Sequence, residues 1–155
     1  MSSYLNIYIK KGEDYTSLFY QGRSSYVYSY LEDSYGHLEK LEIDDIDKAI
    51  VYLNDKKREL NIEIEKIRKK MEMFNKTQCT YSEWNTAYLD NEKYIEDIET
   101  DINEIEYAIG IFNTLSIIAY NCSVCGKDGY MTLWYGIDIA EDDNGNPISN
   151  LKGEK

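Results

Sequence analysis

Two cysteines separated by two residues, Cys122 and Cys125, are the pair in this chain best suited to chemistry. Thiolates at this spacing can both reach one tetrahedral zinc ion, but a complete structural site needs four ligands. Cys79 is too distant, because an intervening helix of about 40 residues would be roughly 60 Å long. His37 could supply a third ligand and an acidic residue a fourth, but nothing in the sequence requires such a site. We therefore expect no metal and no cofactor, and we interpret the cysteines as small residues of a turn-rich loop at 121–129.

Other catalytic arrangements have weaker support in the sequence. The single histidine nearly excludes nucleophile triads, and glycine-rich phosphate loops and dinucleotide fingerprints are absent. Asp142, Asn144 and Gly145 are spaced as in part of a calcium loop. The first and twelfth positions of that loop would be Ala140 and Leu151, so the match fails. We expect no catalytic residues and a protein that is not an enzyme.

Charge is the stronger signal, and it is unevenly distributed. The chain has 17 basic and 29 acidic residues, a formal net charge of -12. This balance disfavours direct binding to nucleic acid or to anionic membranes, and it favours a basic protein surface as partner. Segment 83–106 carries nine acidic residues and one basic residue, whereas segment 44–75 carries eight of each sign. The acidic segment is either a solvated helix face or a negative strip that imitates a phosphate backbone.

Seven residues of the acidic segment are the candidate partner-binding residues. Five are carboxylates that would contact a basic surface, and two are tyrosines that would anchor it. They are Glu92, Glu96, Glu99, Asp101, Glu104, Tyr88 and Tyr94. Part of this negative charge is expected to be neutralised by basic residues of the preceding segment, namely Lys56, Lys66, Arg68 and Lys70. Tyrosine, with 16 copies in the chain, suits half-exposed contact surfaces.

Two apolar stripes that step alternately by four and three residues must position these side chains. This mean spacing of about 3.5 is the heptad signature of helices that wind around each other. The first stripe comprises Ile46, Ile50, Leu53, Lys57, Leu60, Ile64, Ile67, Met71 and Phe74. The second comprises Trp84, Tyr88, Asn91, Ile95, Ile98, Ile102, Ile105, Ile109 and Phe112. The short link between them predicts an antiparallel pair, with Ile64 near Ile95 and Leu60 near Ile98.

The ends of these two helices can also be predicted. Asp44 is a suitable cap for a helix that ends near Asn75. Thr80 and Glu83 form a capping box for a second helix that ends near Tyr120. The one charged residue in the first stripe, Lys57, is expected to extend its amine outward to Asp101 or a neighbour.

Alternating apolar residues predict strands at 4–10, 17–21 and 131–139, with the first two paired as a hairpin and the last beside the first. Segment 24–35 fits either a strand or a short helix capped by Ser24 or Ser25, and we favour the helix. The expected fold class is α+β, a small antiparallel sheet with a long antiparallel two-helix coiled-coil hairpin inserted between its strands.

We expect a single domain over 1–155. Its sheet-bearing head would comprise 1–43 and 121–140, its hairpin 44–120, and a polar tail 141–155. No secretory signal and no apolar run of about 20 residues is evident, which indicates a cytoplasmic protein that does not enter a membrane.

The favoured function is a non-enzymatic acidic protein-interaction module that inhibits a nucleic-acid-handling enzyme by covering its basic surface. A nuclease or CRISPR effector would be such a partner, and the inhibitor would be of the phage anti-defence or anti-CRISPR type. One alternative is a homodimeric structural or assembly scaffold formed through the hairpin. Another is a binding protein that sequesters a nucleotide-like ligand near Arg23 and His37. The sequence does not identify a family, a partner or an oligomeric state.

Overall fold

The chain contains two compact units whose boundaries lie within its two long helices. The computed structural model describes residues 4–11, 14–22, 25–36, 38–75, 80–126, 132–138, 140–141 and 147–148. One unit combines Met1–Ile50 with Ala108–Lys155, and the other is Val51–Tyr107. The expected α+β class is confirmed, because the first unit contains an antiparallel sheet and the second is an antiparallel helical hairpin.

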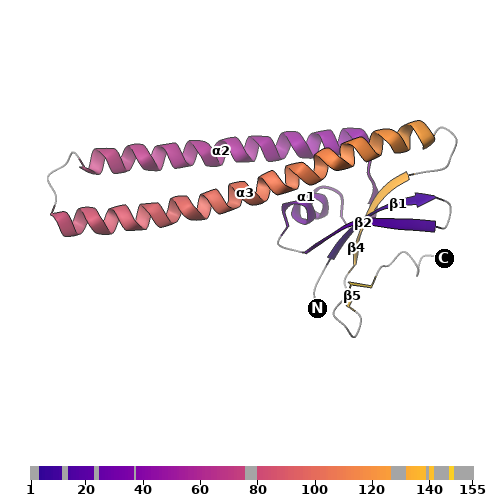
Figure 1. Ribbon diagram of the computed structural model, residues 1–155, viewed down its shortest axis with the longest axis horizontal. Coiled ribbons are helices and arrows are strands. Elements are labelled where there is room, and N and C mark those ends of the chain that lie inside the picture. Colours follow the sequence, from indigo (N-terminus) through magenta and orange to yellow (C-terminus); the bar gives the residue numbers. More distant parts are fainter. Residues whose placement is uncertain are drawn as a thin grey trace. The chain divides into compact units, whose positions relative to one another are not determined.

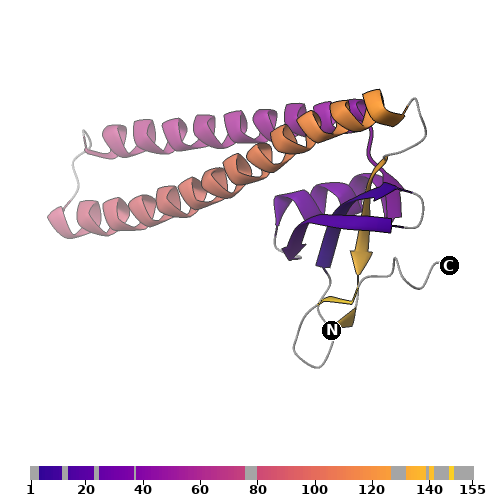
Figure 2. The same ribbon diagram turned by 45° about the vertical axis from the view of Figure 1, so that its right-hand side comes forward.

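The first unit is built on a four-stranded antiparallel sheet. Its strands are β1 (Tyr4–Lys11), β2 (Asp14–Gly22), β3 (Leu38–Lys40) and β4 (Thr132–Asp138), in the order β2-β1-β4-β3. The predicted hairpin of β1 with β2 and the predicted position of β4 beside β1 are confirmed. Figure 2 shows β1 between its two neighbours. The sequence reasoning missed β3, because three residues are too few to show an alternating pattern.

Helix α1 (Tyr26–Tyr35) packs on this sheet, so the helical interpretation of 24–35 is confirmed and the strand alternative is wrong. The Ser25 side chain accepts a hydrogen bond from the Val27 amide at 3.1 Å, which caps the helix. Gly36 ends it with a φ of 88°, a backbone conformation that glycine adopts without strain. The buried hydroxyl of Tyr135 on β4 donates at 3.3 Å to the carbonyls of Leu31 and Gly36. These hydrogen bonds fix the end of α1 to the sheet. Figure 2 shows α1 lying against the strands.

Helix α2 (Ile43–Asn75) begins one residue before the expected cap, and Asp44 does not cap it. Glu42 occupies the N-cap position, since its carbonyl accepts from the Ile46 amide at 3.2 Å, and Asp45 Oδ2 reaches back to accept a hydrogen bond from the Glu42 amide at 3.1 Å. Three neighbouring acidic residues made the sequence ambiguous at this point. Helix α3 (Tyr81–Gly126) begins as predicted, with Thr80 Oγ1 accepting from the Glu83 amide at 3.2 Å and Glu83 Oε2 from the Thr80 amide at 3.4 Å.

The two long helices lie side by side in the second unit (Figure 1). Ile64, Ile95, Ile98 and Ile102 form the core of this helical hairpin, with exposed fractions of 3–8%. Leu60, Ile67 and Met71 pack against these residues, in agreement with the predicted register. Lys57 does extend outward as expected, but its Nζ contacts Glu106 Oε1 at 3.0 Å rather than Asp101.

The end of α3 departs from the expectation. We expected a loop from 121, but the helix continues to Gly126. Cys122 is buried, and it follows Leu115 and Ala119 at helical spacing on the face that packs into the first unit. The polar tail also contains a short antiparallel pair, β5 (Ala140–Glu141) with β6 (Pro147–Ile148), which the sequence reasoning did not identify.

Candidate interaction surface

The candidate partner-binding residues lie on two different sides of α3. A helix turns by about 100° per residue, so position along the chain fixes the side on which each residue lies. Glu92 and Glu96 lie on the same side as Glu99, whose carboxylate is 3.7 Å from Arg68 Nη2. We call this the Glu99 side. The helical hairpin therefore does not gather all seven candidates into one strip.

The opposite flank, which we call the Tyr94 side, carries Asp101 and Glu104. The Tyr94 hydroxyl donates to Glu63 Oε1 of α2 at 2.7 Å, and this contact identifies the flank. That hydrogen bond and the negative charge of Glu63 raise the pKa of Tyr94. Tyr94 is 48% exposed, as an anchor would be, but its hydroxyl is already engaged within the hairpin.

The acidic charge of α3 is only partly neutralised by α2. Arg68, one of the four basic residues expected to neutralise this charge, contacts Glu99, and Lys57 contacts Glu106. Other carboxylates of α3 have no ion-pair partner in the part of the chain that the structure describes, and all are exposed except Glu92, which is half-buried. They are Asp90, Glu92, Glu96, Asp97, Asp101 and Glu104. The solvent-facing half of α3 therefore presents uncompensated negative charge on both flanks.

Three aromatic side chains form a row at the start of α3, which we call the aromatic ladder. The rings of Trp84 and Tyr88 are stacked, with centroids 5.2 Å apart and planes 20° apart. Tyr81 contacts Trp84 at 6.1 Å in a tilted arrangement. Tyr81 is 78% exposed and Tyr88 40% exposed. The sequence reasoning assigned Trp84 to the apolar stripe and overlooked Tyr81, although aromatic residues three and four positions apart lie on one helix side.

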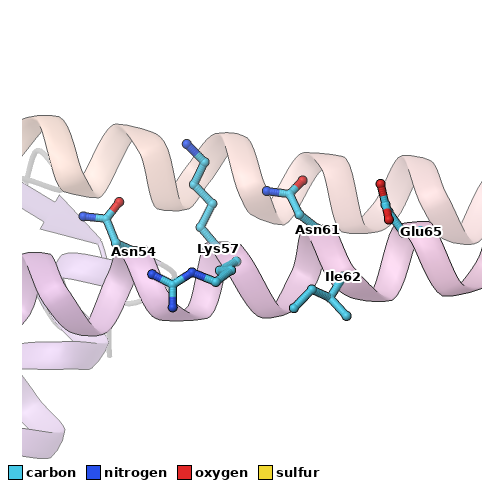
Figure 3. A pocket seen from close by; sticks show the side chains of 6 residues that line it. Asn54, Lys57, Asn61, Ile62 and Glu65 are labelled. Carbon is cyan, nitrogen blue, oxygen red and sulfur yellow. The ribbon is translucent and has the colours of Figure 1, made fainter.

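A shallow groove of about 680 Å³ runs along α2 and is lined by Asn54, Lys57, Arg58, Asn61, Ile62 and Glu65. Figure 3 shows the Lys57 side chain extending toward the neighbouring helix, whereas Ile62 points away from it. Both cations of the groove are already paired, Lys57 with Glu106 and Arg58 with Asp55 at 3.1 Å. The groove therefore offers no uncompensated cation for an anionic ligand.

The candidates for metal or catalytic chemistry gain no geometric support. Among the described residues, no three histidine, cysteine, aspartate or glutamate side chains are placed to hold a metal ion. Cys79, His37, Arg23 and the proposed calcium-loop residues 142–145 lie outside the described residues, as does the side chain of Cys125. Because α3 continues through Cys122, the cysteine pair closes a helix rather than occupying a loop.

None of the helices in the described ranges is both long enough and apolar enough to cross a bilayer. Comparison of the whole chain with protein-family models, with curated proteins and with solved structures found no match in any of the three.

Proposed function

We propose that this protein is a non-enzymatic inhibitor that covers the basic surface of a nucleic-acid-handling enzyme with the solvent-facing half of α3. One observation carries the proposal: exposed carboxylates without ion-pair partners follow both flanks of a single long helix in the described chain. A basic groove shaped to hold a nucleic-acid strand would contact both flanks at once. The division of the candidate residues between two sides is therefore compatible with one binding event.

The electrostatics favour this mode of binding over a direct interaction with nucleic acid. A formal net charge of -12 repels phosphates and attracts a basic protein over several ångströms, which accelerates encounter. The helix fixes the backbone positions of these carboxylates before binding, so binding has to order only their side chains. A cytoplasmic inhibitor of the phage anti-defence or anti-CRISPR type, acting on a nuclease or CRISPR effector, would use these properties.

Paired neutral substitutions test the proposal without reversing charge. Glu92→Gln with Glu96→Gln removes two charges from one flank, and Asp101→Asn with Glu104→Gln removes two from the other. The matched control is Glu59→Gln with Glu65→Gln, which removes two exposed carboxylates from α2. None of the six side chains makes an ion pair or a side-chain hydrogen bond within the described hairpin, so each double variant should keep its stability within about 0.5 kcal/mol.

The readout is inhibition of DNA and RNA cleavage by a panel of purified nucleases and CRISPR effectors. We expect wild type to inhibit at least one of them, both α3 double variants to weaken that inhibition, and the α2 control to retain it. The triple reversal of Glu92, Glu96 and Glu99 to lysine should abolish it, although reversal of Glu99 also disrupts the contact with Arg68. Equal weakening by the α2 control would disprove a role specific to α3.

Neither alternative function receives comparable support. A dimeric scaffold formed through the hairpin requires a second apolar stripe. The exposed apolar residues of the described hairpin are scattered along each helix, singly or in adjacent pairs with charged and polar residues between, so they form no continuous second stripe; they include Val51, Tyr52, Ile62, Leu89 and Tyr107. The residues proposed to sequester a nucleotide-like ligand, Arg23 and His37, lie outside the described chain.

A further inference from the structure

The last residue of the aromatic ladder, Tyr88, is 40% exposed and lies one helical turn before an acidic residue. One face of the Tyr88 ring is covered by Trp84, which lies one turn earlier in α3. In the described chain no second aromatic ring stacks on the opposite face, and Glu92 lies four residues further along on the same side of the helix. The two residues are separated by about 6 Å along the helix axis. A planar cation would fit against the ring and reach the carboxylate.

Arginine suits this gap better than lysine does. Its guanidinium group is flat and weakly hydrated, so it stacks on an aromatic face while its N–H groups donate to a carboxylate. An ammonium group is compact and strongly hydrated, and it cannot make a flat contact with the ring. In the described chain Glu92 has no ion pair, and the only ring contact of Tyr88 is with Trp84.

We propose that the gap between Tyr88 and Glu92 binds an arginine side chain of the partner, with the rest of the aromatic ladder packing against the apolar stem of that arginine or its neighbours. This inference rests on the proposed function and names the chemistry of the partner. Charge selects the occupant: a nucleic acid or a second copy of this chain would bring more negative charge to Glu92 and Glu96. Exposed Trp and Tyr are also the residue types that contribute most at interfaces.

The test compares an oligoarginine peptide with an oligolysine peptide of the same length and charge, by calorimetric titration of the full chain at low ionic strength. Wild type should bind the arginine peptide about three- to fivefold more tightly, which is the magnitude expected for one exposed cation–π contact. Tyr88→Leu should reduce the ratio of the two peptide affinities to about one. Tyr88→Phe, which keeps the ring face, should retain the wild-type ratio. Glu92→Gln should weaken binding of the arginine peptide more than binding of the lysine peptide.

Tyr107→Leu is the matched control, because Tyr107 is 64% exposed on the same helix but lies outside the ladder. It should leave the arginine preference unchanged. Equal affinity of wild type for the two peptides, or a preference that survives Tyr88→Leu, would overturn the arginine site and leave the acidic surface intact. Failure of wild type to bind either peptide would overturn the arginine site and contradict the proposed function as well.

Discussion

The hydroxyl of Tyr35, the last residue of α1, donates a hydrogen bond of 3.0 Å to Asp45 Oδ1 in the first turn of α2. The other oxygen of the same carboxylate accepts from the Glu42 amide at 3.1 Å. One side chain therefore caps α2 and ties it to α1. Burial of the hydroxyl, together with the hydrogen bond to Asp45 and its negative charge, raises the pKa of Tyr35 above the usual value for tyrosine.

Tyr35→Phe should lower the free energy of unfolding at neutral pH by about 1–2 kcal/mol, because it removes a hydrogen bond to a charged group. The difference from wild type should shrink above about pH 10, where the unfolded chain releases the Tyr35 proton but the folded chain still holds it. Urea unfolding at neutral and strongly alkaline pH measures both effects. Tyr120→Phe, at an exposed tyrosine of α3, is the control. A difference that stays constant with pH would contradict the raised pKa.

Asn6→Val should stabilise the protein by about 1–2 kcal/mol. Asn6 lies on the central strand β1 and is 1% exposed, and neither its Oδ1 nor its Nδ2 has a hydrogen-bond partner in the described chain. Burial of an unpaired amide is unfavourable, and valine is also the better strand residue. Thermal unfolding monitored by circular dichroism would detect the gain. Asn6→Asp should instead destabilise the fold, since it buries a carboxylate at the same position.

Ile98→Ala should cost about 2–4 kcal/mol of unfolding free energy, because it opens a cavity in the core of the helical hairpin, where Ile98 is 5% exposed. Ile62→Ala is a matched control with the same change of side chain. Ile62 is 48% exposed on α2, so its truncation should change stability by less than about 0.5 kcal/mol. Similar losses for the two variants, measured by urea unfolding, would show that the two helices do not pair in this register.

Thr80→Ala should destabilise the first turn of α3 by about 1 kcal/mol, since it removes the side-chain half of the capping box with Glu83. The expected signature is local: amides of the first turn should exchange faster with solvent, while those near Ile98 keep their protection. The control is Ser82→Ala, because Ser82 is exposed and lies two residues after Thr80. Unchanged exchange in the first turn of the Thr80 variant would rule out the capping role.

The long-range periodic elements of this fold could be predicted from sequence, and the short or charge-defined ones could not. A heptad pattern repeated over nine positions leaves little choice of partner, which is why Ile64 and Ile95 meet as expected. The start of α2 depends on which of several adjacent acidic side chains accepts a hydrogen bond from the Glu42 amide. Local composition does not determine which side chain does so. The continuation of α3 through Cys122 did have a signal, the spacing from Leu115 and Ala119, but the cysteine motif suggested a loop.

The candidate surface was predicted in composition but not in geometry. Charge counts identified α3 as the acidic helix, and Tyr88 is exposed as expected. The helical repeat determines the flank on which each carboxylate lies. Neutralisation of a carboxylate depends instead on single contacts, such as that of Glu99 with Arg68, which the repeat does not predict. The stacking of Trp84 on Tyr88 was not visible in the sequence, because a residue in an apolar stripe near a helix end can be either covered or open to solvent.

The placement of both long helices between β3 and β4 has a consequence for the order of folding. Leu38 pairs with Gly136 in the sheet, yet all of α2 and α3 separates them along the chain. Closing so long a segment of flexible chain is entropically slow, whereas pairing of two helices across a short link involves near neighbours. Once α2 and α3 have paired, the two ends of the segment between β3 and β4 are closer to each other. Assembly of α2 with α3 should therefore precede the β3–β4 pairing, and variants that delay it should slow refolding of the sheet.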